Sequence, residues 1–280
     1  ELASGLIEAR APQGLTGAEI LLPLPSVGAT ENLMLAAVAA SGTTVIRNAA
    51  REPEIVDLAH CLGAMGAKIV GAGSHVLTIE GGAALTGAVH DVVPDRIELG
   101  TLACVAAVTD GEILLRHGRA AHLGAALSAF QAAGVDLCEE ADGLRARRAP
   151  GGLAGIDVVT QPYPGFATDL QAPTMALLTL AKGASAITET LFEQRFLHVG
   201  ELRRMGADIA VHGRTARVRG VAGLHGATVA CTDVRAAAAL VIAGLAADGE
   251  TVLTGLDHLD RGYDRIVDKL AACGADIVRR

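Results

Sequence analysis

Aromatic side chains are scarce in this chain, which has no Trp, two Tyr and four Phe among its 280 residues. Positive charge is also in the minority, because 23 Lys and Arg stand against 31 Asp and Glu and the net charge is -8. Surfaces that bind nucleic acid are usually basic and often stack bases on aromatic rings. The composition therefore predicts no nucleic-acid partner and favours a small ligand.

Long hydrophobic runs are lacking as well. The longest strongly apolar stretch, residues 236–247, has about a dozen residues, whereas a membrane-spanning helix needs roughly 20. The first residues contain neither the basic region nor the apolar region of a secretory signal. We therefore expect no membrane partner and a cytoplasmic location.

Metal and redox motifs are missing too. The cysteines are odd in number, widely spaced and without any Cys-x-x-Cys pair, so zinc and dithiol chemistry are not indicated. This pattern fits a reducing cytoplasm and plain packing in the core. The cysteines are Cys61, Cys104, Cys138, Cys231 and Cys273. His198 and His258 are expected to be hydrogen-bonding loop residues, and no metal or organic cofactor is predicted.

The chain does contain a phrase that recurs four times, about 70 residues apart: a Gly-led strand, a helix, and a second Gly followed by another strand. The leading glycines are Gly42, Gly111, Gly183 and Gly249, and the closing ones are Gly66, Gly134, Gly206 and Gly274. The spacing exceeds the roughly 20 to 50 residues of solenoid repeats. It predicts an α/β fold of repeated βαβαββ units, with a last strand over 274–277.

Two kinds of helix are predicted in each unit. One is amphipathic, like the helix that opens at Pro53 beside acidic residues and stops at Gly66. The other is apolar nearly all round and must be enclosed, because it has no polar face to give to water. Such helices cover residues 33–40, 102–108, 175–181 and 236–247. We expect them to pack together inside a ring of sheets, as an inside-out α/β barrel, with their N-termini at one end.

Polar residues precede the apolar helices, at Ser26, Asp95, Thr168, Asp169 and Asp233. Capping of free backbone N–H groups is the simpler interpretation for each of them. Several helix N-termini that converge on one cleft would also make an anion site. Arg195, Arg235 and Arg261 lie in segments expected to face the same end, which favours that second interpretation.

The string Pro162–Gln171 is the most diagnostic segment of the chain. Further motifs span residues 26–32, 51–54, 192–196, 232–236 and 258–263. Together these segments closely resemble the UDP-N-acetylglucosamine enolpyruvyl transferases, and the likeness runs through essentially the entire chain. The resemblance implies a transferase of the first committed step of peptidoglycan synthesis, and so a part in cell wall biogenesis, cell shape and cell division. It also implies an enzyme of two domains, each of three repeats, with the active site in the cleft between them.

Only four repeats are present, so the resemblance implies the C-terminal two-thirds of such an enzyme. Residues 1–93 would be a remnant, about one repeat, of the first domain, and residues 94–280 a nearly complete second domain without its N-terminal strand. The family's Lys-Asn pair, one phosphate-binding Arg and the loop with the reactive Cys have no counterpart here, and the chain does not start with Met. We therefore expect the chain alone to be inactive, and its incomplete first domain to expose apolar surface and self-associate.

The family's reaction, as the resemblance implies it, moves the enolpyruvyl group of phosphoenolpyruvate onto the 3'-hydroxyl of UDP-N-acetylglucosamine. A tetrahedral intermediate forms and then loses phosphate. Asp169 matches the family's proposed general base for that hydroxyl, and Arg261 matches a phosphoenolpyruvate ligand. Asp233 is the third catalytic candidate, although an ion pair with Arg235 that merely shapes the loop is an alternative.

Substrate-binding positions are implied in the same way. Ser26, Val27 and Gly28 match a stretch that holds the nucleotide diphosphate through helix-terminal N–H groups, and Leu191 and Phe192 match contacts to the sugar nucleotide. The full set of substrate-binding candidates is Ser26, Val27, Gly28, Thr168, Asp169, Leu191, Phe192, Arg195, Arg235 and Arg261. Two alternatives stay open: the shikimate-pathway enolpyruvyl transferase, which shares the fold, and a non-catalytic remnant that binds a sugar nucleotide or a partner.

Overall fold

The computed structural model describes residues 2–3, 6–7, 9–193 and 195–280, so Gln194 of the 192–196 motif lies outside it. The chain divides into two compact units, residues 1–93 and Pro94–Arg280, each with its own hydrophobic core. That these units correspond to the first and second domains of the resembled enzymes stays a prediction.

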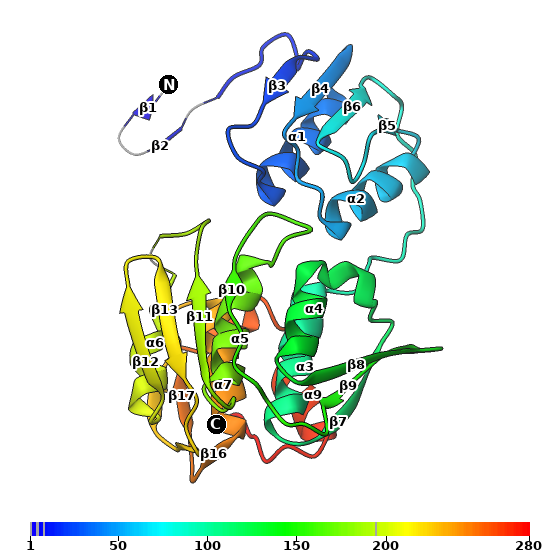
Figure 1. Cartoon of the computed structure of the whole chain (residues 1–280). Helices are drawn as coiled ribbons and strands as arrows, with labels where there is room; N and C mark the ends of the chain where they lie inside the picture. Colours follow the sequence, from blue (N-terminus) through cyan, green and yellow to red (C-terminus); the bar gives the residue numbers. More distant parts are fainter. Residues whose placement is uncertain (1, 4–5, 8, 194) are drawn as a thin grey trace. The chain divides into compact units, whose positions relative to one another are not determined.

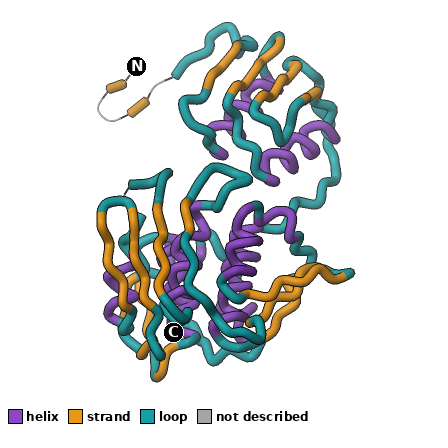
Figure 2. The backbone as a smooth tube through the Cα atoms, viewed as in Figure 1, coloured by secondary structure: helices purple, strands orange, loops and turns teal. Residues whose placement is uncertain are grey.

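Unit 1 contains one complete copy of the repeat after a short pair of strands, β1 (Leu2–Ala3) and β2 (Leu6–Ile7). Its elements are β3 (Glu19–Leu21), α1 (Val27–Ala39), β4 (Thr43–Arg47), α2 (Pro53–Ala64), β5 (Lys68–Val70) and β6 (Val76–Glu80). The sheet order is β3-β4-β6-β5, with β3 parallel to β4 and the other two pairs antiparallel. This is the predicted βαβαββ unit (Figure 2).

Unit 2 holds the other three copies (Figure 1). Its first elements are α3 (Arg96–Val108), β7 (Glu112–Arg116), η1 (Ala120–Leu123), α4 (Ala125–Ala132), β8 (Val135–Glu140) and β9 (Gly143–Arg148). Next come β10 (Val158–Val159), η2 (Thr168–Leu170), α5 (Gln171–Leu178), β11 (Ala184–Thr188), α6 (His198–Arg204), β12 (Asp208–His212) and β13 (Thr215–Arg219). The last are β14 (Leu224–His225), β15 (Thr228–Ala230), α7 (Val234–Leu245), β16 (Ala247–Asp248), β17 (Val252–Thr254), α8 (Asp257–Asp260) and α9 (Ile266–Ala272).

The sheets of unit 2 confirm the repeat. The order β10-β11-β13-β12 has the same pattern of parallel and antiparallel pairs as the sheet of unit 1. The other described sheets are shorter versions: β7-β9-β8, β15-β17 and β14-β16. The strand predicted over 274–277 is wrong, because these residues follow α9 without strand structure. A strand needs a neighbour: β5, β8 and β12 each pair with the strand that follows them, whereas no described strand lies beside residues 274–277.

The apolar helices α3, α5 and α7 pack against one another inside unit 2, as predicted. Every residue of α5 is buried, and α3 and α7 are buried over most of their length. Figure 1 shows these helices between the sheet of β11, β12 and β13 and the sheet of β7, β8 and β9. The α/β class with helices inside and sheets outside is confirmed, although the described strands form separate open sheets and no closed barrel.

The apolar helix of unit 1 departs from the prediction. Only one face of α1 is buried, through Thr30, Met34, Ala37 and Val38, while Leu35 is 51% exposed. The sheet of unit 1 covers a single side of α1, and the described residues of unit 1 form no second apolar helix to cover the other. An apolar helix is enclosed only when it has partners on every side.

The cysteine prediction holds in part. Cys104 and Cys231 are buried, but Cys138 and Cys273 are exposed. Cys138 follows the buried Leu137 in β8 and so occupies the outward position of an alternating strand. Cys273, just after α9, borders a groove that is open to solvent.

Candidate active site

The starts of the three apolar helices lie at one end of unit 2. Arg235, in the first turn of α7, donates from Nη2 to Asp169 Oδ2 at 3.2 Å, just ahead of α5. The Arg235 guanidinium also lies over the ring of Tyr263, with 5.5 Å to the centroid. The Tyr263 hydroxyl is 2.9 Å from Thr101 Oγ1 of α3. One chain of contacts thus joins α3, α5 and α7, which confirms the predicted convergence.

Most of the polar residues at these helix starts are caps, as the simpler interpretation predicts. The Asp95 carboxylate accepts bonds from the N–H groups of Ile97 and Glu98. The Asp233 carboxylate likewise accepts bonds from the backbone N–H groups of Arg235 and Ala236. In unit 1, Ser26 Oγ accepts a bond from the N–H of Ala29. These three side chains satisfy the free N–H groups of a helix end.

Thr168 and Asp169 are the exceptions. Neither η2 nor α5 has a side-chain cap, and both Asp169 oxygens bind guanidinium groups instead. Arg195 Nη2 donates to Oδ1 at 2.6 Å, and Arg235 Nη2 donates to Oδ2. The capping interpretation is therefore wrong for Asp169. Its carboxylate, 36% exposed, sits between two cations from separate parts of the chain.

The surroundings of Asp169 favour its charged form. Burial by itself raises the pKa of the Asp169 carboxyl, but Arg235 and Arg195 outweigh burial and hold that pKa below its ordinary value. Asp169 is therefore a carboxylate at neutral pH. A carboxylate in this state can accept a proton from a hydroxyl group that comes within hydrogen-bond reach.

A second carboxylate, that of Glu189, is connected to Arg195 through the Thr168 hydroxyl. Arg195 Nη1 donates to Thr168 Oγ1 at 2.9 Å, and Thr168 Oγ1 donates to Glu189 Oε2 at 2.7 Å. Glu189 is fully buried and follows β11. The backbone N–H groups of Leu191 and Phe192 donate to its other oxygen, Oε1. The network therefore joins Thr168 and Asp169, from the predicted motif 162–171, to Phe192 and Arg195, from the predicted motif 192–196.

Several buried polar atoms beside this network have no hydrogen-bond partner among the described residues: Gln171 Oε1, His198 Nε2, and Nε and Nη1 of Arg235. Burial lowers the pKa of His198 to about 4, although Asp233 acts in the opposite direction, so its imidazole is neutral. The expectation of a loop histidine is wrong, because His198 is the first residue of α6 and is buried. Unpaired buried donors and acceptors give the site a capacity for further polar groups.

The other predicted residues are placed differently. Phe192 is 56% exposed, with the Arg195 guanidinium 5.2 Å from its ring centroid. Arg261 is exposed, and its Nη2 lies 3.3 Å from Nδ1 of His258. His258 belongs to α8 and not to a loop, so that expectation is wrong. Among the described residues, no contact joins Arg261 to Asp169. Asp233 caps α7, and the Arg235 side chain pairs with Asp169. The described residues therefore do not form the alternative ion pair between Asp233 and Arg235.

Ser26, Val27 and Gly28 lie in unit 1, at the start of α1. Gly28 is exposed, and a Cβ there would meet no atom within 4 Å. The helix start is therefore open on this side, which leaves room for a ligand against its N–H groups.

Sequence reasoning missed Glu189, Thr160, Gln171 and Tyr263 as parts of the site. Glu189 could have been found, because a charged residue directly after an apolar strand and two residues before Leu191 is unusual. Thr160 and Gln171 carry no such signal, since neither residue type is distinctive near a strand or helix end.

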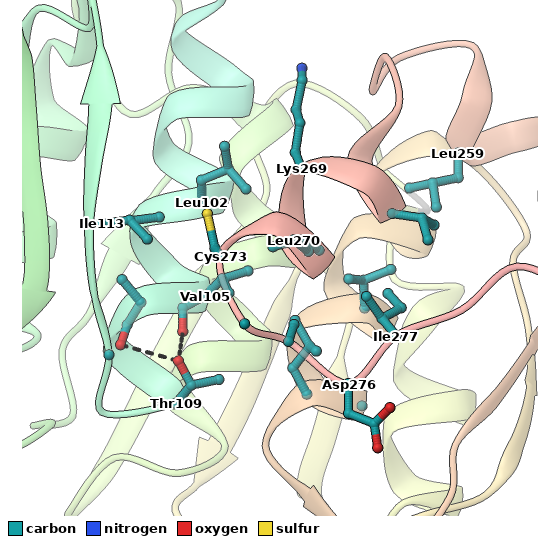
Figure 3. A pocket seen from close by; sticks show the side chains of 18 of the residues that line it. Leu102, Val105, Thr109, Ile113, Leu259, Lys269, Leu270, Cys273, Asp276 and Ile277 are labelled. Atoms are coloured by element: carbon teal, nitrogen blue, oxygen red, sulfur yellow. Dashed lines mark hydrogen bonds between the residues drawn. The ribbon is translucent and has the colours of Figure 1, made fainter.

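A groove elsewhere in unit 2 is a different feature. This groove, of about 1610 Å³, runs between α3 with β7 on one side and α9 with the last residues on the other. Figure 3 shows Leu102, Val105 and Ile113 across from Leu270 and Ile277. Asp169, Arg195 and Arg235 do not line it. Its mostly apolar walls do not suit anionic substrates, so we place the candidate site at Asp169. The described residues contain no group of His, Cys, Asp and Glu arranged to hold a metal, and no described helix is both long and apolar enough to cross a bilayer.

A core of apolar helices surrounded by sheets of repeated units, with an Asp and two Arg at the helix starts, defines the class of enolpyruvyl transferase-like proteins. Residues 3–270 match the family described as EPSP synthase (3-phosphoshikimate 1-carboxyvinyltransferase), and the chain belongs to that family. Among similar solved structures, the enolpyruvyl transferase NikO from Streptomyces tendae is 28% identical, with a TM-score of 0.81 over 94% of this chain and 65% of that one. EPSP synthase from Acinetobacter baumannii, at 19% identity and a TM-score of 0.70, shares the fold.

Curated relatives are closer in sequence. The UDP-N-acetylglucosamine 1-carboxyvinyltransferase of Granulibacter bethesdensis is 58% identical over 278 residues, which are 99% of this chain and 66% of that protein. The protein of the same name from Caulobacter vibrioides is 55% identical over 279 residues. The chain thus spans somewhat less than two thirds of the length of these relatives.

Proposed function

We propose that the Asp169 site serves transfer of the enolpyruvyl group from phosphoenolpyruvate to the 3'-hydroxyl of UDP-N-acetylglucosamine. One observation carries the proposal: the Asp169 carboxylate is free of any capping duty and is held between Arg195 and Arg235. The choice of acceptor is supported by relatives at 53–59% identity, all of which bear the name of the sugar-nucleotide enzyme. The family description names a shikimate acceptor instead, so the acceptor needs a direct test.

The proposed reaction uses Asp169 as a general base. Its carboxylate accepts the proton of the sugar hydroxyl while the hydroxyl oxygen bonds to C2 of phosphoenolpyruvate and a proton adds to C3. In the second half, the bond from C2 to the phosphate oxygen breaks, C3 loses a proton and phosphate leaves. The two arginines supply positive charge for an anionic reaction. An anionic substrate group that bound one guanidinium would also weaken its hold on Asp169 and make that carboxylate a stronger base.

The remaining candidates join this proposal on the family likeness. We assign the nucleotide diphosphate to Ser26, Val27 and Gly28, and phosphoenolpyruvate to Arg261. Asp233 would act mainly by fixing the start of α7, which carries Arg235. The five unpaired cysteines suit a reducing compartment, which supports a cytoplasmic location.

Replacement of Asp169 tests the proposal. Because the chain covers part of its relatives, we would supply the unmatched residues from the Granulibacter bethesdensis protein in a chimaera. Asp169→Asn keeps the shape but removes the basic oxygen, so kcat is expected to fall ~10²-fold or more, with a smaller change in KM for the sugar nucleotide. Asp276→Asn, on the exposed segment after α9, is the matched control. Near-normal turnover of the Asp169→Asn chimaera would reduce Asp169 to a structural residue.

A further inference from the structure

Glu189 is a fully buried carboxylate at the end of two parallel strands. It follows β11, and Thr160 follows the neighbouring strand β10. A buried carboxylate is costly unless hydrogen bonds compensate for lost water. Glu189 accepts hydrogen bonds from four donors, which compensate for the water that its carboxylate loses on burial. The reaction proposed for Asp169 does not use this group directly.

The two oxygens of Glu189 have separate partners. Oε1 accepts bonds from Thr160 Oγ1 at 2.7 Å and from the N–H groups of Leu191 at 2.9 Å and Phe192 at 3.1 Å. Oε2 accepts one bond, from Thr168 Oγ1. Oε1 therefore fixes the backbone of the 191–192 segment, and Oε2 acts on the segment that carries Asp169.

The bond to Oε2 determines what Thr168 can do. A hydroxyl has a single hydrogen, and when that hydrogen points to Glu189 the oxygen lone pairs face the other way. Thr168 Oγ1 uses them to accept a bond from Arg195 Nη1, while Arg195 Nη2 binds Asp169. The planar guanidinium is thus held at both nitrogens in one orientation. Without the Thr168 bond, Asp169 would be the only hydrogen-bond partner of the guanidinium among the described residues, beside its contact with the Phe192 ring.

We propose that Glu189 is a positioning residue that, through the Thr168 hydroxyl, holds the Arg195 guanidinium on Asp169, and that its other oxygen independently fixes the segment of Leu191 and Phe192. The contribution to catalysis rests on the function proposed above, whereas the contribution to the ion pair does not. The buried Glu189 carboxylate orients the Thr168 hydroxyl, and that hydroxyl orients the Arg195 guanidinium.

The test reads the ionisation of Asp169 in the 280-residue chain. Carbon-13 NMR of labelled Asp carboxyls, assigned with Asp169→Asn, follows its pKa in each variant. Burial raises this pKa and Arg235 and Arg195 lower it, so a loosened Arg195 raises it. The other titratable groups near the pair are His198, which lies near both Arg195 and Asp233, and Tyr263 beside Arg235, and all of these residues stay unchanged.

Glu189→Gln is the decisive variant, because two explanations predict opposite signs. Loss of a nearby negative charge acting directly through space would lower the Asp169 pKa. Loss of the Arg195 anchor raises it, and a rise is our expectation. Thr168→Val, which changes no charge, should also raise the Asp169 pKa, whereas Thr168→Ser should leave it at the value of the unmodified chain. The double variant Glu189→Gln/Thr168→Val should raise the pKa little more than either single variant. Glu193→Gln, on the same segment but exposed and paired with Arg214, should change nothing.

The inference would be overturned if the Asp169 pKa falls or does not change in Glu189→Gln and also does not change in Thr168→Val. The catalytic part is measured separately in the chimaera. Glu189→Gln keeps the bonds to Oε1 and loses the bond from Thr168 to Oε2. The loss of one charge-assisted hydrogen bond should lower kcat ~10-fold, with KM for the sugar nucleotide little changed. If the unmodified chimaera shows no transfer, the proposed function fails while the NMR result still decides the role of Glu189.

Discussion

Asp169 differs from the two other acids at helix starts by what its oxygens bind. Asp95 and Asp233 each use one oxygen for two backbone N–H groups, which is enough to explain an acid at that position. Asp169 has no such bond and instead neutralises two arginines that would otherwise repel each other. At the residue scale, this contrast separates a candidate functional acid from structural ones.

The lowered pKa of Asp169 predicts a pH dependence of stability. Its folded pKa lies below the ordinary value of 3.8, so its ion pairs stabilise the chain above that value, and this contribution disappears as the pH falls through the lower, folded pKa. Asp169→Asn should therefore reduce the free energy of unfolding at neutral pH, and the difference from the unmodified chain should shrink toward zero below about pH 4. Urea titrations at several pH values measure it. Asp276→Asn should show no such trend, and a constant difference for Asp169→Asn would contradict the assignment.

At the scale of elements, close helix packing places the site. Gly100 of α3 faces Leu170, the residue between Asp169 and α5, and a Cβ at position 100 would lie 2.7 Å from Leu170 Cδ2 and 3.2 Å from Phe130 Cε2. Leu170 and Phe130 are fully buried. The absence of a side chain at Gly100 therefore lets α3 approach the start of α5.

Gly100→Ala should consequently destabilise unit 2. Overpacking of a filled core costs about 1 to 3 kcal/mol, which exceeds the gain of up to ~1 kcal/mol from replacing Gly by Ala in a helix. Urea unfolding followed by circular dichroism measures the change. Gly200→Ala in α6 is the matched control, because a Cβ there meets nothing within 4 Å, and it should be neutral or stabilising. Equal stability of the two variants would mean that α3 and α5 are not packed this closely.

Sequence reasoning succeeded for elements that follow local rules. Helix stops at Gly66, Gly134 and Gly206 have the positive φ that glycine adopts easily, and the repeat came from similar local strings. It failed where the outcome depends on distant partners. The segment 274–277 has strand-like residues but no strand beside it, and α1 has the composition of a buried helix without the neighbours. Likewise, no local pattern distinguishes Asp169 from Asp233, since only the fold brings Arg195 and Arg235 to one of them.

At the scale of the whole molecule, four copies of one supersecondary unit occur in two compact units, and the three copies of unit 2 enclose three helices whose starts form the candidate site. The fold is common to acceptors as different as those named for the EPSP synthase family and for the sugar-nucleotide relatives. Fold alone therefore does not decide the acceptor. Under the function proposed above, the segments around Asp169 and Phe192 contribute to that choice.

The most direct measurement is phosphate release from phosphoenolpyruvate by the chimaera, with UDP-N-acetylglucosamine and, in a separate reaction, with shikimate 3-phosphate as acceptor. The account predicts release that depends on the sugar nucleotide, is lost in Asp169→Asn, and is at least ~10²-fold slower with shikimate 3-phosphate, because a site built to pair with one acceptor leaves its polar groups unpaired with the other. Release that depends on shikimate 3-phosphate, or that persists unchanged in Asp169→Asn, would contradict it.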